Sequence, residues 1–313
     1  MSDVKPIAQH SAYLDMLIQS LVNGGALEME FGYGLELYHR GLQDIALLHL
    51  NVPYSELGIS ERRESCKPKM MVLQSASGDY KVVDENSIGS ESSTPEGSIA
   101  VMRLRGMMQN EGGLSSRGIY DFADDMRAAY RNRNVAAIIV DTDSGGGQSG
   151  AGNLAREVIN ERNKPVLANV HFAASAAYNA ISGADEIIAA SKESRFGGIG
   201  TFITLDMKLL TEYKARFMDI YADESGGKNK PFRAALDGDF SILKAMVNQM
   251  TGEFQDSIKA ARPLSGDRLT IKETLSGAMF NATEAKNRGL SDGTGNFNYL
   301  LSRTKAWIKK KKA

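Results

Sequence analysis

Four short apolar runs recur between residues 98 and 190 at intervals of roughly 30 residues, and this repeat constrains the fold most strongly. We expect the runs to be strands, at 98–104, 135–140, 166–170 and 186–190. Amphipathic segments at 119–132 and 151–163 lie between them and are typical of helices. Continuous apolar strands that alternate with helices indicate parallel strands covered on both faces. The sequence therefore predicts an α/β fold.

The rest of the chain divides around this repeat. Apolar residues at helical spacing predict a helical N-terminal segment over 1–74, and a stretch rich in Ser, Gly, Glu and Asp predicts a linker over 75–97. The α/β domain then spans 98–300. Within it, a long helix is expected at about 236–262, with one apolar stripe that packs in the core or against another subunit, and Pro263 ends it. We interpret the lysine-rich end, 301–313, as a solvated basic tail.

Composition excludes several classes of protein. The 37 basic and 38 acidic residues give a formal net charge of −1, which argues against a protein built around nucleic acid. A single cysteine, Cys66, excludes an internal disulfide and a cysteine-based zinc cluster. The first residues lack a signal-peptide pattern, and no apolar window is long enough to span a membrane. We expect a soluble, cytoplasmic protein.

A glycine-rich turn follows the second expected strand. Gly145, Gly147 and Gly150 match the G-x-G-x-x-G pattern of dinucleotide sites. That function also needs an acidic residue at the end of the next strand, which reads LANVHFAA and has none, and no P-loop lysine follows the glycines. Two interpretations stay open: backbone N–H groups that stabilise an oxyanion, or a tight strand-to-helix turn.

Ser175 lies among four alanines where a strand should give way to a helix. It is either an accessible nucleophile or an ordinary helix N-cap. A nucleophilic serine needs a base, but no histidine follows Ser175 in the chain, and His171 is better explained as a packing or surface residue. A lysine that burial keeps uncharged could take the proton instead. Several downstream lysines are candidates on this reasoning.

Six ordered motifs over about 97–296 resemble the signal peptide peptidase A family, in particular its phage branch of prohead (capsid maturation) proteases. They are IAVMRLRGMM, VAAIIVDTDSGGGQSG, NKPVLANVHFAASAAY, SRFGGIGTF, GGKNKPF and GAMFNATEAKNRGLSDGTG. The resemblance implies that Ser175 is the nucleophile and Lys230 the general base, with Lys228 the nearest alternative. It also implies an oxyanion hole from the backbone near Gly146, Gly147 and Ala176.

The same resemblance implies a crotonase/Clp-like α/β fold and cofactor-free peptide hydrolysis. It further implies an oligomer, in which the serine and lysine come from one subunit or from two. The sequence departs from the family pattern at Gly145, at Ala176-Ala177 and at Gly198, where the family has proline, Gly-Gly and serine. Without a membrane anchor, the chain fits a protease that cuts scaffold or capsid proteins in the prohead, and itself within 75–97.

Three alternatives remain from the sequence. The first is a soluble bacterial protease of the signal-peptide-peptidase type. The second is a catalytically inactive family member with a structural role, which the altered motifs suggest. The third is a crotonase-type acyl-CoA enzyme that uses the same oxyanion geometry and has no need for Lys230.

Overall fold

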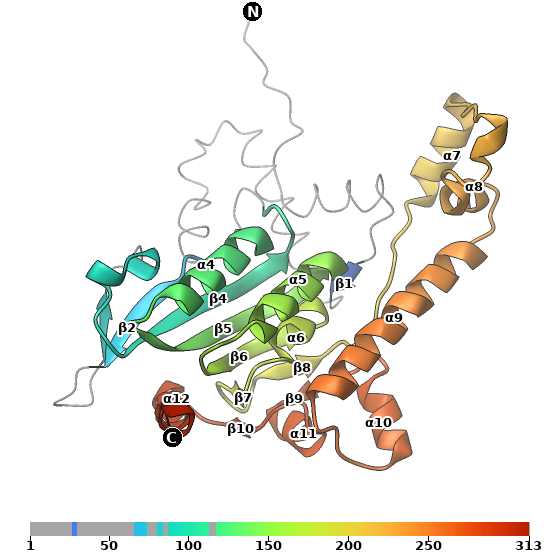
Figure 1. The fold of residues 1–313 in the computed structure, drawn as a ribbon. Helices are drawn as coiled ribbons and strands as arrows, with labels where there is room; N and C mark the ends of the chain where they lie inside the picture. The colour runs from blue at the N-terminus through green and yellow to red at the C-terminus, as the bar shows by residue number, and fades with distance from the viewer. Residues whose placement is uncertain (1–26, 30–65, 74–79, 84–86, 113–116, 313) are drawn as a thin grey trace, which may run out of the picture.

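The computed structural model describes residues 27–29, 66–73, 80–83, 87–112 and 117–312 (Figure 1). Most of the expected N-terminal helical segment, including His10, His39 and His49, lies outside these residues. Its described parts are two strands, β1 (Leu27–Met29) and β2 (Lys69–Leu73).

A mixed sheet forms the centre of the molecule, with its main path in the order β10-β7-β6-β5-β4-β2-β3. Its parallel strands are β4 (Ser98–Met108), β5 (Val135–Gln148), β6 (Val166–Ala174), β7 (Glu186–Ala189) and β10 (Gly293–Thr294). Strands β2 and β3 (Tyr80–Val83) continue it antiparallel beyond β4. The short strand β8 (Arg195–Gly197) pairs with the end of β6, and β9 (Met279–Asn281) pairs with β8. Strand β1 pairs with the end of β5. The predicted α/β fold is confirmed.

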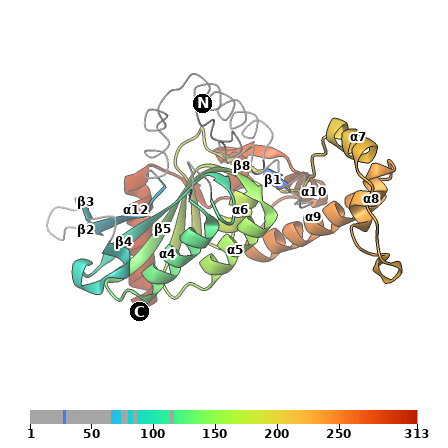
Figure 2. The same cartoon turned by 90° about the horizontal axis from the view of Figure 1, so that it is seen from above.

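Helices cover both faces of the sheet, as the apolar strands require (Figures 1 and 2). One face carries α4 (Ile119–Arg131), α5 (Ser149–Asn160) and α6 (Ala176–Ile181). Their buried side chains join those of the strands in the main core, where Met126, Ile159, Tyr178 and Phe196 have almost no exposed surface. The other face carries α12 (Phe297–Lys312), whose Leu300 and Leu301 pack on Ile139 and Leu167 in a second, smaller core.

The remaining helices follow the sheet in the chain and reach away from it. They are α7 (Met207–Arg216), α8 (Lys230–Leu236), α9 (Ser241–Ala261), α10 (Arg268–Thr274) and α11 (Ala282–Asn287). In both views, α7 and α8 lie at the far end of α9, away from the sheet (Figures 1 and 2). We call residues 207–240 the arm. Within it, Tyr213 packs edge-to-face on Phe232, with ring centroids 5.2 Å apart.

The expected long helix is shorter than predicted and its stripe is only partly buried. It begins at Ser241 because a turn at Gly238 (φ 82°) separates it from α8, and the Asp239 carboxylate accepts a hydrogen bond from Ser241 N–H. Phe254 and Ile258 of the stripe lie in the core. Phe240, at the other end, is 39% exposed.

Two segments expected to be irregular contain regular structure. Inside 75–97, residues 80–83 form β3, and two 3₁₀ turns, Ser87–Gly89 and Glu91–Ser93, follow. Ile88 of the first turn is buried in the main core. The end of the chain, expected to be a solvated tail, continues α12 to Lys312. It does so because Leu301 and Thr304 are buried against the sheet, while the terminal lysines Lys309 and Lys310 face solvent.

Candidate active site

Ser175 occupies the turn between β6 and α6, where the sequence placed it. Its backbone has φ 56° and ψ −125°, a conformation that residues other than glycine rarely adopt and that costs about 1–3 kcal/mol. Two hydrogen bonds hold it there: Ser175 N–H donates to the Gly197 carbonyl at 2.8 Å, and Asn179 N–H donates to the Ser175 carbonyl at 2.9 Å. A sharp strand-to-helix turn of this kind presents the nucleophile in α/β hydrolases.

The Ser175 side chain does not cap the helix. An N-cap serine would accept a hydrogen bond from a backbone N–H in the first turn of α6, and Ser175 makes no such bond. The residue is 2% exposed, and its Oγ has no hydrogen-bond partner in the described structure. A buried hydroxyl without a hydrogen-bond partner destabilises the folded protein, so a role other than stabilising the fold is expected for it. The N-cap interpretation does not supply that role.

The glycine strip 145–147 is part of β5 and lies at the end of the sheet where β6 turns through Ser175 into α6. Gly146 and Gly147 pair with Met107 and Met108 of β4. At Gly147 a side chain is excluded, because a Cβ there would lie 2.1 Å from the Met108 carbonyl oxygen. The strip is therefore more than a turn: it is a strand end whose backbone is not covered by its own side chains.

One of the predicted oxyanion donors already has a side-chain hydrogen-bond partner. Gly146 N–H already donates to Ser144 Oγ at 3.1 Å, and that hydroxyl donates to the Gly106 carbonyl at 2.6 Å. Sequence reasoning did not single out Ser144, although it lies directly before the glycines. Ala176, the first residue of α6, packs closely on α5: a Cβ on Gly152 would lie 2.9 Å from the Ala176 Cβ.

Gly198, the residue after β8, borders Ser175. A Cβ on Gly198 would lie 3.2 Å from Ser175 N, and its φ of 63° strains any residue with a side chain. The family serine that the sequence lacks at this position would therefore stand directly beside the nucleophile. Gly198 N–H donates to the Ala278 carbonyl at 3.0 Å, which ties this loop to β9.

The structure does not bring Lys230 to Ser175 within one chain. Lys230 is the exposed first residue of α8, in the arm, and Lys228 is exposed in the preceding turn. Both views show α8 well separated from α6 (Figures 1 and 2). His171 is not a partner of Ser175 either. It is about half exposed, and its Nε2 lies 3.4 Å from Asp141 Oδ1, which confirms its interpretation as a surface or packing residue.

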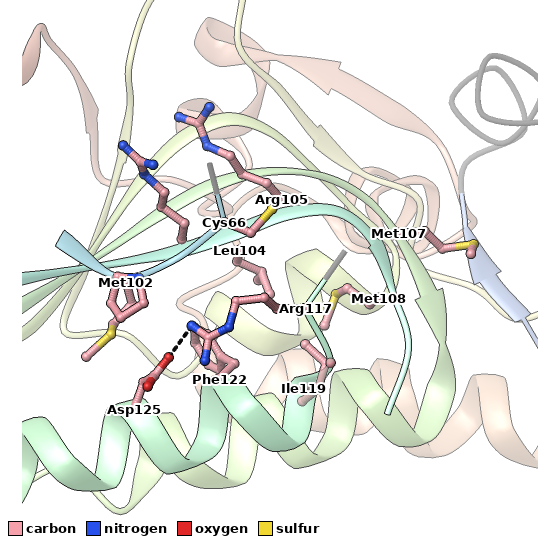
Figure 3. A pocket seen from close by; sticks show the side chains of 13 residues that line it. Cys66, Met102, Leu104, Arg105, Met107, Met108, Arg117, Ile119, Phe122 and Asp125 are labelled. Atoms are coloured by element: carbon pink, nitrogen blue, oxygen red, sulfur yellow. Dashed lines mark hydrogen bonds and ion pairs between the residues drawn. The ribbon is translucent and has the colours of Figure 1, made fainter. Parts of the chain in front are cut away.

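A small cavity lies on the β4 side of the glycine strip, between β4 and α4 (Figure 3). Its lining is mostly apolar, with Met102, Met108 and Phe122 on the side of Arg117, whereas Met107 points away from them. An ion pair between Arg117 and Asp125, 2.5 Å long, closes one side. The cavity holds none of the predicted catalytic residues. Among the described residues, no cluster of His, Cys, Asp or Glu could hold a metal ion.

The strained turn at Ser175 and the glycine strip at the end of β5 lie at the same end of the α/β sheet. Residues 159–311 match the model of peptidase family S49. The match contains Ser175 and Lys230 and begins after the glycine strip. It supports a serine peptidase, as the motif resemblance predicts.

Comparison with solved structures concerns the fold. The chain is similar to a variant of ClpP1 from Listeria monocytogenes, with 14% identity, a TM-score of 0.41, and coverage of 63% of this chain and 91% of that one. It is also similar to a variant of the 1510-N membrane-bound stomatin-specific protease, with 18% identity, a TM-score of 0.44 and coverage of 67% and 84%. Human enoyl coenzyme A hydratase domain-containing protein 3 has 14% identity, a TM-score of 0.36 and coverage of 68% and 73%. The α/β architecture is that of the sheet and helices described above, and its Clp/crotonase-like character stays a prediction of the motif resemblance.

No curated protein sequence matches the chain. In the part of the chain that the structure describes, no helix is both long enough and apolar enough to span a bilayer.

Proposed function

We propose that the protein is a serine endopeptidase in which Ser175 is the nucleophile and Lys230 of a second copy is the general base. One observation carries the proposal: Ser175 holds a buried, unpartnered hydroxyl on a strained strand-to-helix turn. A strained backbone and a buried hydroxyl without a hydrogen bond both destabilise the fold, and residues with such features are typical of catalytic positions.

In this mechanism, uncharged Lys230 takes the proton of Ser175 Oγ as the oxygen attacks the scissile carbonyl carbon. Backbone N–H groups of Gly147 and Ala176 stabilise the resulting oxyanion; Gly146 N–H joins them when it leaves Ser144 Oγ. Protonated Lys230 then gives its proton to the leaving amine as the C–N bond breaks. Water hydrolyses the acyl-enzyme and restores the serine.

The arm supports a lysine supplied by another copy. It carries Lys230 away from its own Ser175, and its apolar residues face solvent: Phe217 is 56% exposed, Met218 88% and Ile220 90%. Exposed apolar residues in such a group are typical of a protein interface. A second copy seated there would also exclude water, and burial favours the uncharged form of a lysine amine.

Labelling with a small alkyl fluorophosphonate tests the proposal, since this probe reacts with an activated serine. We expect labelling of the wild type at Ser175 and none in Ser175→Ala. Lys230→Ala should label slower by a factor of about 10²–10⁴, the usual contribution of a general base. Lys228→Ala is the matched control and should label like the wild type. Undiminished labelling of Lys230→Ala would reject the dyad, and absence of labelling in the wild type would favour an inactive, structural family member.

For the substrate, we propose scaffold or capsid proteins of a phage head, cut inside the infected or lysogenic cell. Support comes from the GGKNKPF motif and its neighbours in order along the chain. Self-cleavage within 75–97 belongs to the same proposal. Mass spectrometry of the purified protein should find a new N-terminus in that stretch in the wild type and none in Ser175→Ala.

A further inference from the structure

The end of β5 has one edge that β6 leaves open. Strand β6 pairs with β5 as far as Ala173 opposite Ser144, and then turns through Ser175 into α6. Strand β5 continues to Gln148, and β4 pairs with its other edge at Gly146 and Gly147. The edge of residues 146–148 that faces away from β4 therefore begins beside Ser175. We call it the open edge.

Residues Leu27–Met29 occupy this open edge. They form β1, which pairs antiparallel with β5 so that Met29 lies opposite Gly146, Glu28 opposite Gly147 and Leu27 opposite Gln148. The contact joins segments that are more than 100 residues apart in the sequence. It also places a piece of the chain across two of the glycines assigned to the oxyanion hole.

An extended peptide that reaches Ser175 needs the same edge. Strand edges bind peptides through backbone N–H and C=O groups, largely independently of side chains. The opposite edge of 146–147 is filled by β4, so a peptide there would have to replace a strand of the central sheet. A peptide along the glycine strip must therefore replace β1.

We propose that β1 is a built-in competitor: the open edge of β5 is the docking strand for extended peptides, and residues 27–29 hold it closed until they leave. This inference rests on the proposed function. It predicts a latent enzyme whose nucleophile reacts with small probes, whereas extended peptides gain access only when β1 unpairs.

The test removes the pairing of β1 with β5 and keeps the rest of the chain. Along an antiparallel pair of strands, only every second residue donates its N–H to the partner strand. Proline has no N–H, so prolines at two successive positions remove one such donor whichever of the two residues makes the bond. The variant is Leu27→Pro/Glu28→Pro, and the matched control is Leu27→Ala/Glu28→Ala, which retains both N–H groups. Hydrogen–deuterium exchange of the intact full-length proteins then reports on the amides of 145–148. We expect faster exchange there in the proline variant only.

Two serine probes separate this inference from the proposed function. A small alkyl fluorophosphonate should label all three proteins, with only a small gain in the proline variant where β1 leaves Gly147. A peptidyl phosphonate, which must lie along the open edge, should label the proline variant about tenfold faster than the other two, corresponding to the loss of one or two hydrogen bonds. Equal peptidyl labelling of all three, or unchanged exchange at 145–148, would overturn the competitor role and leave the proposed function intact. If neither probe labels any of the three proteins, both the competitor role of β1 and the proposed function are rejected.

Discussion

At the scale of single residues, Ser175 combines a strained backbone with a side chain that holds nothing in place. Its main-chain bonds to Gly197 and Asn179 fix the turn, and its hydroxyl contributes no bond to the fold. The hydroxyl is therefore separable from the structure around it. Stability measurements can test that separation without any assay of activity.

We expect Ser175→Ala to be neutral or to stabilise the protein by up to about 1 kcal/mol, because it removes a buried hydroxyl that has no partner. Ser182→Ala is the matched control, since the Ser182 hydroxyl is buried and donates to the Asn179 carbonyl at 2.7 Å. It should cost about 0.5–1.5 kcal/mol. Urea denaturation of the three proteins measures both differences. An equal loss in Ser175→Ala would mean that its hydroxyl has a structural partner.

Two glycines of α5 differ sharply in the space around them. A Cβ at Gly152 would lie 2.9 Å from the Ala176 Cβ, whereas at Gly150 the nearest neighbour is the Asn110 side-chain nitrogen at 3.6 Å. We expect Gly152→Ala to cost about 1–3 kcal/mol and to slow fluorophosphonate labelling, because α6 must move with Ser175. Gly150→Ala should be neutral or slightly stabilising. Equal effects of the two variants on unfolding would contradict the close packing of α5 on α6.

At the scale of elements, α12 is fixed to the sheet by one buried carboxylate as well as by its leucines. Glu186 of β7 is 6% exposed and accepts hydrogen bonds from Arg303 Nε and Trp307 Nε1, both at 2.8 Å. These bonds orient the helix across the face opposite to Ser175. Leu300 and Leu301 then cover Ile139 and Leu167 of the central strands.

We expect Glu186→Ala to lower the free energy of unfolding by about 1.5–3 kcal/mol, since it removes the acceptor of two bonds, one of them charged. Lys309→Ala, on the exposed side of the same helix, should leave it unchanged. Thermal unfolding followed by circular dichroism measures both. Because α12 lies on the other face of the sheet, labelling of Ser175 in Glu186→Ala should stay near the wild-type rate at temperatures where the variant is folded.

Elements with a strong local pattern could be predicted, and those fixed by distant contacts could not. The apolar runs gave the cores of β4 to β7, and the serine among alanines marked the turn from β6 to α6. The strain at Ser175 left no sequence signal, since hydrogen bonds to residues far along the chain or within the turn impose it. Strand β1 has only three residues, and two of its three partners are glycines that offer no side chains to match. Helix α12 was not predicted, because the lysines near the end favoured a solvated tail over the helical spacing of Phe297, Leu300 and Leu301.

At the scale of the whole molecule, the arm separates the two proposed catalytic residues. We expect Met218→Glu/Ile220→Glu to dissociate the proposed oligomer, because it places charges where apolar side chains, 88% and 90% exposed, would meet another copy. Light scattering coupled to size exclusion measures the mass. Leu269→Glu, at an equally apolar but separate site that is 74% exposed on α10, should leave the mass unchanged. A wild type that is monomeric at all concentrations would contradict the shared site.

Mixing inactive variants tests the division of labour directly. Ser175→Ala retains Lys230, and Lys230→Ala retains Ser175, so a mixed assembly contains complete sites only if the two residues come from different chains. We expect each variant alone to be inactive and their mixture to recover peptide cleavage after subunit exchange. The Met218→Glu/Ile220→Glu background is the control and should abolish the recovery. Failure of the mixture to recover activity in a confirmed mixed oligomer would place both residues in one chain.

Because the arm carries Lys230 away from its own Ser175, the proposed activity requires two chains to associate. A single newly synthesised chain would contribute Ser175 to one site and Lys230 to another but would contain no complete site. It would therefore cleave no protein around it. Dilution would lower the activity and a high local concentration would raise it. At low concentration the cleavage rate would increase at least with the square of the protein concentration. Such a chain would time its own cutting by how densely it has been gathered.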